Sequence, residues 1–191
     1  MKKVVCVLGS PRRKGNTETI ADRYLEAARE CGAQVETFRL YDLNYQGCVA
    51  CLGCKRAEAC VLQDDLTPVL EAIAAADVFV LAAPVYFGQV PGPVKCLIDR
   101  MYSFFAYARD AKKIYTSRLA PGKHLVFVTS QGSADPETFD MFPDYAKFFG
   151  EGWFGFTTHL LRAVGKNKPG ETAQDEALMA QAAELARETV G

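Results

Sequence analysis

The strongest constraint on the fold of this chain is a regular alternation of short apolar runs with amphipathic helical segments. The apolar runs lie at 3–8, 35–40, 78–83, 124–130 and 153–161, and helical periodicity is found at 16–31, from 67 onward, and at 94–101, 137–149 and 171–190. Short runs that are apolar throughout are typical of strands buried on both faces of a parallel sheet. The alternation therefore predicts a three-layer α/β sandwich with a five-stranded parallel sheet of order 2-1-3-4-5.

Length and charge limit the remaining possibilities. At 191 residues with 49% hydrophobic residues, the chain is expected to form one domain, 1–191, with a cysteine-rich loop inserted at about 44–66. The 22 basic and 23 acidic residues nearly balance, and no basic run exceeds Arg12-Arg13-Lys14, so we expect no nucleic-acid partner. The first apolar run is too short for a signal peptide and none is long enough for a membrane span, so we expect a cytoplasmic protein without a membrane partner.

The loop at 9–17 joins the first predicted strand to the first predicted helix. It reads Gly-Ser-Pro-Arg-Arg-Lys-Gly-Asn-Thr, which adds two hydroxyls, the side chain of Asn16 and up to three cations to the free N–H groups of a helix start. We expect Asn16 to cap this helix. The loop matches neither G-x-x-x-x-G-K-[ST] nor G-x-G-x-x-G. It therefore predicts a phosphate site other than that of an ATP-hydrolysing or dinucleotide-binding protein.

Two other loops follow predicted strands and point to a flavin. Residues 84–88 read Pro-Val-Tyr-Phe-Gly after the third strand, and residues 130–133 read Ser-Gln-Gly-Ser after the fourth. In a sheet of order 2-1-3-4-5, the order of flavodoxin-like domains, such loops meet in one crevice beyond the carboxyl ends of the strands. Tyr86 and Phe87 could cover a flat ring there, so the three loops together predict an FMN site.

Four of the seven cysteines are closely spaced, at Cys48, Cys51, Cys54 and Cys60. Gaps of two residues allow successive thiolates to turn toward one centre, and we expect Gly47 and Gly53 to relieve the backbone. Four thiolates suit one cubane iron–sulfur cluster, but they also suit zinc. An empty or oxidised thiol loop is the third possibility.

Other candidate residues are interpreted as structural. Cys6, Cys31 and Cys96 lie in predicted strands or helices and are expected to be small buried hydrophobes. Lys95 and Asp99 have the spacing of a helical ion pair, Asp64 and Asp65 are placed to precede and cap a helix, and His124 and His159 have no second histidine nearby in the sequence. The aromatic segments 102–107 and 142–156 are expected to form core or subunit interface.

Three motifs together resemble a known family. They are G-S-P-R-x-x-G-N-T, C-x2-C-x2-C-x5-C followed by Asp64-Asp65, and Pro84-Val85-Tyr86-Phe87 leading to Lys95 and Asp99-Arg100. This pattern resembles the iron–sulfur flavoproteins, a branch of the flavodoxin-like NAD(P)H-dependent FMN reductases. The resemblance covers roughly the first hundred residues.

The resemblance implies an electron-transfer flavoprotein or oxidoreductase with FMN and a [4Fe–4S] cluster in each subunit of a homodimer or homotetramer. By position, the FMN phosphate would be held by Ser10, Arg12, Asn16 and Thr17, and the rest of FMN by Pro84, Val85, Tyr86, Phe87, Gly88, Ser130, Gln131 and Gly132. Cys48, Cys51, Cys54 and Cys60 would ligate the cluster, and no catalytic acid or base is expected. The electron donor, ferredoxin-like or pyridine nucleotide (NADH or NADPH), stays open.

Two alternatives belong to other classes. One is an NAD(P)H-dependent FMN, quinone or azo-type reductase without a cluster. The other is a flavodoxin-like carrier or a zinc-stabilised interaction module that is not an enzyme.

Overall fold

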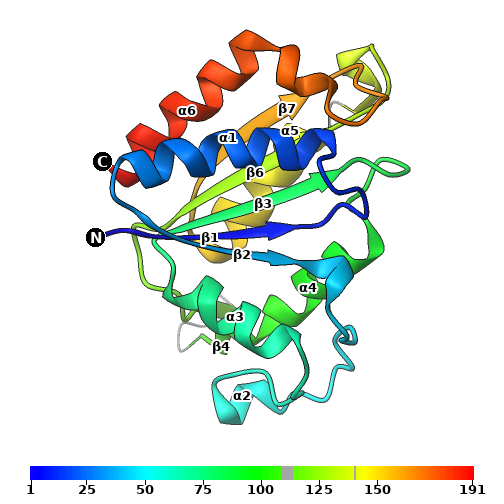
Figure 1. Ribbon diagram of the computed structural model, residues 1–191. Helices are drawn as coiled ribbons and strands as arrows, with labels where there is room; N and C mark the ends of the chain where they lie inside the picture. The colour runs from blue at the N-terminus through cyan, green and yellow to red at the C-terminus, as the bar shows by residue number, and fades with distance from the viewer. Residues whose placement is uncertain (109–113, 140) are drawn as a thin grey trace.

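A computed structural model describes residues 1–108, 114–139 and 141–191. Its main sheet has five parallel strands, in the order β2 (Gln34–Arg39), β1 (Lys3–Leu8), β3 (Val78–Pro84), β6 (His124–Ser130) and β7 (Thr157–Ala163) (Figure 1). In chain order of the sheet strands this is 2-1-3-4-5. The predicted flavodoxin-like sheet is therefore confirmed.

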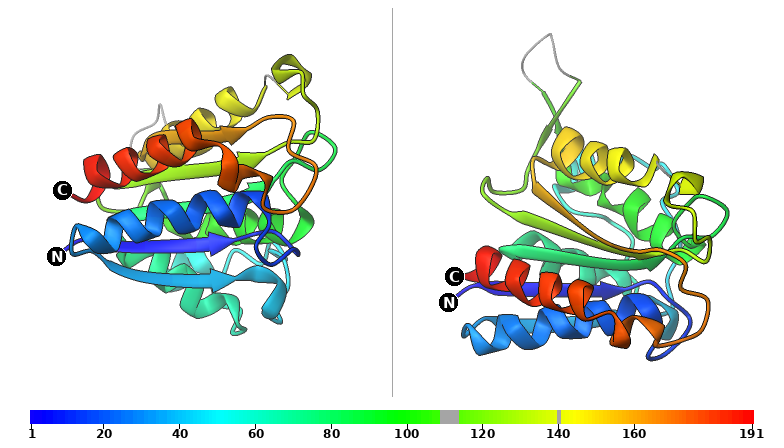
Figure 2. Two further views of the ribbon diagram at one scale, coloured as in Figure 1. Left: turned by 45° about the horizontal axis from the view of Figure 1, so that its top comes forward. Right: turned by 90° about the horizontal axis from the view of Figure 1, so that it is seen from above.

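Helices cover both faces of the sheet (Figure 2). One face carries α1 (Asn16–Glu30) and α6 (Glu176–Val190), and the other carries α3 (Leu66–Ala75), α4 (Gly92–Arg100) and α5 (Met141–Lys147). Each face has its own apolar cluster, because β1, β3 and β6 send alternate side chains to opposite sides. This arrangement explains why the central strands are apolar without a break.

Several short elements complete the fold. They are the 3-10 helices η1 (Leu40–Asp42), η2 (Met101–Phe104), η3 (Pro136–Phe139) and η5 (Glu171–Gln174), the short helix α2 (Cys54–Ala57), the antiparallel pair β4 (Phe105–Tyr107) and β5 (Tyr115–Ser117), and the π-helix η4 (Phe148–Phe154). The prediction of a strand at 153–161 was wrong at its start, because Trp153 lies in η4. Gly155, with a φ of 75°, ends η4 before β7 begins. Aromatic residues favour strands, so sequence reasoning extended the strand too far back.

Two of the three isolated cysteines differ from the prediction. Cys6 is fully buried in β1, as expected, but Cys31 is exposed and Cys96 is half-buried. Cys31 is the C-cap of α1, which ends at Glu30, and it is followed by Gly32, whose φ is +80°. The residue therefore lies past the last turn that packs on the sheet.

The two histidines also differ from the prediction, because each has the other as a neighbour. Nδ1 of His124 lies 3.1 Å from Nε2 of His159, and their rings are stacked. β6 and β7 are adjacent parallel strands, so residues that are far apart in sequence become close in space. Burial is the main cause that lowers the pKa of both rings.

In the described part of the chain, no helix has the length and hydropathy needed to cross a membrane.

Candidate functional site

The loops at the carboxyl ends of four strands, β1, β3, β6 and β7, meet around one crevice, which we call the strand-end crevice. Its volume is about 200 Å³. It is lined by Ser10, Arg12, Gly15, Asn16, Thr17, Pro84, Val85, Tyr86, Ser130, Gly132, Lys166, Asn167 and Pro169. Ligands of flavodoxin-like sheets bind at this edge.

Most of the residues proposed from the sequence line this crevice. Nine of the twelve candidates line it. In the part of the chain that the structure describes, three candidates lie outside the lining, namely Phe87, Gly88 and Gln131. Phe87 is fully exposed in a left-handed turn. The side chain of Gln131 is buried instead, where it accepts a hydrogen bond of 2.6 Å from Arg162 and donates one of 3.0 Å to the carbonyl of Asp135.

Sequence reasoning missed the segment at 166–169, which contributes three residues to the lining. This segment follows β7, the fifth strand of the sheet, and it is rich in lysine, asparagine and proline. A polar loop after the last parallel strand is expected at the same edge as the other loops. Correct placement of the end of β7 would have revealed it.

The prediction that Asn16 caps α1 was wrong. The N-cap is Gly15, and Asn16 is the first helical residue. The side chain of Asn16 donates hydrogen bonds of 3.3 Å and 3.0 Å to the carbonyls of Lys166 and Lys168, and it accepts one of 3.3 Å from the N–H of Thr172. Asn16 therefore joins the start of α1 to the missed segment. Since glycine has no capping side chain, the N–H groups of the first turn are left for an anion.

The three cations of the loop have different partners. Arg12 lines the crevice, whereas Arg13 turns away and donates a hydrogen bond of 2.7 Å to Asp42. Lys14 is absent from the crevice lining among the described residues, and Lys166 provides the second cation there. The expectation of up to three loop cations in the site is thus reduced to one, with one added from the last loop.

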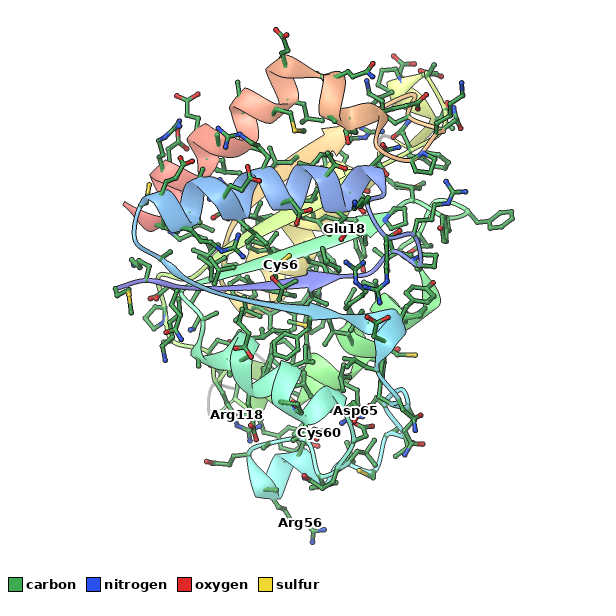
Figure 3. The ribbon with its side chains drawn as sticks, viewed as in Figure 1. Cys6, Glu18, Arg56, Cys60, Asp65 and Arg118 are labelled. Carbon is green, nitrogen blue, oxygen red and sulfur yellow. The ribbon has the colours of Figure 1, made fainter. Side chains whose placement is uncertain are left out.

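A buried acid, Glu18, lies in the first turn of α1, close to this basic region (Figure 3). It forms an ion pair with Arg39 and accepts a hydrogen bond of 2.7 Å from the N–H of Lys14. Burial alone would raise the pKa of Glu18, but these bonds hold the pKa below its ordinary value. The charge of Glu18 is thereby neutralised by Arg39. Lys166 is paired in turn with Asp175 at 3.2 Å, so Arg12 is the cation of the lining for which the described residues show no carboxylate partner.

Gly132 lies where two loops approach each other closely. A Cβ at this position would lie 2.4 Å from Oδ1 of Asn167, whose side chain donates a hydrogen bond of 2.9 Å to the carbonyl of Gly132. A larger residue would have to displace the side chain of Asn167 and with it this hydrogen bond. Gly132 thus keeps the crevice closed on this side.

The second candidate site is the cysteine loop, which we define as residues 46–62. All four clustered cysteines line one small pocket, together with Arg100, Tyr102 and Ser103. Cys54 is buried, Cys60 is half-buried, and Cys48 and Cys51 are exposed. Figure 3 shows Cys60 on the side of the sheet that is opposite α1.

Three residues other than glycine bend the cysteine loop. Ala50, Leu52 and Glu58 have positive φ angles of 54°, 58° and 61°. The expectation that Gly47 and Gly53 relieve the backbone was wrong; Gly53 has an ordinary helical φ of −56° and packs closely against Val61. Residues with side chains are strained in this conformation, and such strain is concentrated at functional sites.

The cysteine pocket has the donor set for an iron–sulfur cluster or for zinc, since both accept four thiolates. Burial raises the pKa of Cys54, and Lys55 lowers it. The other three clustered cysteines raise this pKa further, because all three lie close enough to Cys54 to interact with it electrostatically. As placed, no group of three or more His, Cys, Asp or Glu residues in the described ranges could hold a metal ion.

Two structural expectations near this loop are confirmed. Lys95 and Asp99 form an ion pair of 2.6 Å on α4. Asp64 accepts a hydrogen bond of 3.1 Å from the N–H of Leu66 at the start of α3. Asp65, by contrast, accepts from the N–H of Asn44 at 2.7 Å, and so it holds the loop rather than the helix.

The segments 102–107 and 142–156 meet in an aromatic cluster between α4 and η4. Phe105 stacks on Phe154 with ring centroids 4.7 Å apart and contacts Trp153 edge-on at 5.8 Å. Phe148 and Trp153 are 61% and 45% exposed, so the cluster continues to the surface. An apolar pocket of about 570 Å³ lies here, with Cys48 in its lining. We call this surface the aromatic face.

Fold and crevice together define a flavodoxin-like α/β protein with a polar crevice at the start of its first helix. Residues 2–137 match the model of the family described as NADPH-dependent FMN reductase. Since this match covers more than half of the chain, the protein belongs to the NADPH-dependent FMN reductase family.

Curated relatives are similar to part of the chain. The iron–sulfur flavoprotein of Methanosarcina thermophila is 38% identical over 98 residues, which are 51% of this chain and 51% of that protein. An iron–sulfur flavoprotein of Archaeoglobus fulgidus is 32% identical over 102 residues, 53% of this chain and 46% of that one. The matched part thus spans about half the length of these relatives.

Solved structures share the whole fold. The NAD(P)H:quinone oxidoreductase from Methanothermobacter marburgensis has a TM-score of 0.73 at 18% identity and covers 97% of this chain and 98% of its own. An FMN-dependent NADH-azoreductase from Bacillus anthracis, in complex with FMN, has a TM-score of 0.73 at 17% identity and covers 99% of this chain and all of its own. At these identities the likeness concerns the fold.

Proposed function

We propose that this chain is an FMN-dependent oxidoreductase whose cysteine loop holds a [4Fe–4S] cluster. The observation that carries the proposal is the strand-end crevice, where nine of the twelve residues expected to hold FMN line one space. Membership of the FMN reductase family supports the flavin. Relatives named iron–sulfur flavoproteins support the cluster.

The residues of the crevice fit the parts of FMN. The first-turn N–H groups of α1, the hydroxyls of Ser10 and Thr17 and the guanidinium of Arg12 would bind the phosphate, while Asn16 holds the segment at 166–169 in place. Pro84 to Gly88 and Ser130 to Gly132 would lie along the ribityl chain and the ring. When bound, FMN accepts electrons singly or in pairs, whereas a cubane cluster normally passes one.

One of the clustered cysteines lies where electrons could pass to a partner protein. Cys48 lies both in the cysteine pocket and in the lining of the aromatic face. We propose that a second copy of this chain covers the aromatic face, in a homodimer or homotetramer, because large exposed aromatic patches are typical of interfaces. The electron donor would be a pyridine nucleotide or a ferredoxin-like protein.

Flavin binding can be tested with single substitutions. Arg12→Ala removes a charge-assisted contact to the phosphate, which contributes about 1.5 to 3 kcal/mol, so the Kd for FMN should rise about 10- to 100-fold in a fluorescence titration. Arg13→Ala is the matched control, because Arg13 faces Asp42 outside the crevice lining. Equal effects of the two substitutions would contradict the placement of the phosphate.

The cluster requires a separate measurement. Anaerobically purified protein should contain about four irons and four acid-labile sulfides per chain. Stoichiometric zinc without sulfide would refute the cluster and support the zinc-stabilised module. Steady oxidation of NADH or NADPH by FMN-loaded, iron-free protein would instead support the reductase without a cluster. Protein that binds neither FMN nor metal would refute both flavin enzymes, with and without the cluster.

A further inference from the structure

Arg100, the last residue of α4, is a buried arginine that the proposed function does not use. Its side chain is fully buried, and its guanidinium makes five hydrogen bonds. Nε donates to Sγ of Cys60 at 3.0 Å, Nη1 to the carbonyl of Gln46 at 3.0 Å and to Asp64 at 2.8 Å, and Nη2 to the carbonyl of Leu62 and to Asp64, both at 3.2 Å. An arginine has five N–H donors, so every one of them has a partner.

Two of these bonds fix the ends of the cysteine loop, and two more reach Asp64 just beyond it. Gln46 precedes the first clustered cysteine and Leu62 follows the last, so one guanidinium joins the entry and the exit of the loop. Asp64 balances the charge of Arg100 through two oxygen atoms. Burial alone would lower the pKa of Arg100, but Asp64 and Cys60 hold the pKa above its ordinary value, and the guanidinium stays charged.

The fifth bond is different in kind, because it reaches a sulfur. Two other cations near the loop, Lys55 and Arg118, donate to backbone carbonyls, at 2.8 Å from Lys55 to Tyr102 and at 3.2 Å from Arg118 to Cys54. Those bonds support the backbone. Arg100 instead donates its Nε–H to the side chain of Cys60, while Asp64 balances the charge of the guanidinium.

We propose that Arg100 is a positioning residue for the iron–sulfur site, which holds Cys60 as a ligand and raises the reduction potential of the cluster through the Nε–H bond to its sulfur. Hydrogen bonds to ligand sulfurs stabilise the more reduced state, since negative charge on the sulfurs grows when the cluster takes up an electron. Cys60 follows the longest gap in the motif, so its sulfur depends more than the others on support from outside the loop. This inference rests on the proposed function.

The test compares two substitutions that weaken the same ion pair. In Arg100→Lys a single charged nitrogen replaces the guanidinium. One nitrogen cannot donate to both Asp64 and Cys60, which Arg100 reaches through two different nitrogens, Nη1 and Nε, so this variant loses the sulfur bond. Asp64→Asn is the matched control, since it weakens the ion pair but leaves the Nε–H donor in place. The readouts are iron and acid-labile sulfide content, and the midpoint potential of the cluster in a redox titration followed by visible absorption and electron paramagnetic resonance.

Each result decides the proposal. A loaded Arg100→Lys protein with a more negative potential than both wild type and Asp64→Asn supports it, and so does loss of the cluster from Arg100→Lys alone. An unchanged potential in a fully loaded Arg100→Lys protein overturns it, and so does equal loss of the cluster from both variants, because the ion pair rather than the sulfur bond would then be responsible.

Two further measurements separate other failures from this one. FMN content reports folding, because the strand-end crevice is built from other loops. If Arg100→Lys lacks FMN as well, the double variant Asp64→Asn/Arg100→Met, which removes both charges, takes its place with the same readouts. If the wild-type protein binds no iron and sulfide after anaerobic reconstitution, the proposed cluster itself fails, whatever the variants do.

Discussion

Gly9, at the residue scale, lies where the chain leaves β1 and passes close to α4. A Cβ at this position would be 2.1 Å from Cγ2 of Val94, a contact that cannot exist without movement of one of the two segments. Both Val94 and the neighbouring β3 residue Ala82 are fully buried, so there is little room for relaxation. Gly9 is thus fixed by packing, while its φ is ordinary.

We expect Gly9→Ala to lower the free energy of unfolding by about 1 to 3 kcal/mol, as overpacking of a tight core does. Val94→Ala removes the methyl group that the new Cβ would meet, although it leaves a small cavity of its own. In urea denaturation, the double variant should therefore lose less stability than the sum of the two single variants. Strict additivity of the three values would contradict the proposed clash.

At this scale, sequence reasoning found residue types better than side-chain directions. Ser10 and Thr17 were expected in the crevice and line it, because the strand–loop–helix connection leaves them no other place. Gln131 was expected there too, but its amide turns inward to Arg162. The spacing of residues along a loop carries no information on which neighbour a side chain will meet. Arg100, although part of a recognised motif, gave no sign of its contact with Cys60.

Helix α6, at the element scale, begins with a side-chain cap. Asp175 is its N-cap and accepts a hydrogen bond of 3.2 Å from the N–H of Leu178, and it also pairs with Lys166 of the crevice at 3.2 Å. Asp175→Ala should lower the free energy of unfolding by about 0.5 to 2 kcal/mol in thermal or urea denaturation. Glu184→Ala, on the exposed face of α6, should change it by less than about 0.5 kcal/mol. An effect of Asp175→Ala as small as that of Glu184→Ala would show that the cap is dispensable.

The histidine pair joins β6 and β7 and should make stability depend on pH. The folded protein disfavours protonation of both rings, chiefly by burial; Lys2 lowers the pKa of His124 further, while Glu151 and Glu188 partly oppose the shift at His159. Protons then bind more readily to the unfolded chain, so stability is full above the ordinary histidine pKa of about 6.5 and falls below it.

Urea denaturation at pH 7 and pH 5.5 measures this effect. The wild-type protein should lose more free energy of unfolding over this interval than His159→Gln, which keeps a polar group but does not titrate. Since this substitution also removes the partner of His124, the free energy of unfolding of each protein at pH 5.5 is compared with its own value at pH 7. The same decrease in both proteins would show that other groups cause the pH dependence.

Regular elements were predicted well where the period of the apolar pattern is clean. β1 and β6 have the predicted bounds, and the start of α1 was placed correctly, because long runs of one period leave little choice. The β4–β5 pair and the π-helix η4 were missed. Both are rich in aromatic residues, whose packing against Phe105 and Phe154 decides their backbone more than any local preference does.

At the scale of the whole molecule, the aromatic face is the surface at which we propose that two copies of the chain associate. If a second copy covers it, Phe148→Glu should shift the protein from dimer toward monomer in analytical ultracentrifugation, because a buried unpaired carboxylate opposes association. Gln181→Glu adds the same charge on the exposed face of α6, in the opposite layer, and should leave the assembly unchanged. A wild-type protein that is monomeric at high concentration would refute the proposed interface.

The strand-end crevice is closed by segments that lie far apart in the sequence. Its first residues lie in the loop after β1, its last at 166–169, and Asn16 ties one to the other with hydrogen bonds that span about 150 positions. The family match ends at residue 137, before the closing segment. During synthesis on the ribosome, this crevice is thus complete only after β7 and the segment behind it have emerged. A ligand that needs all of these walls is therefore captured only after residue 169 has emerged.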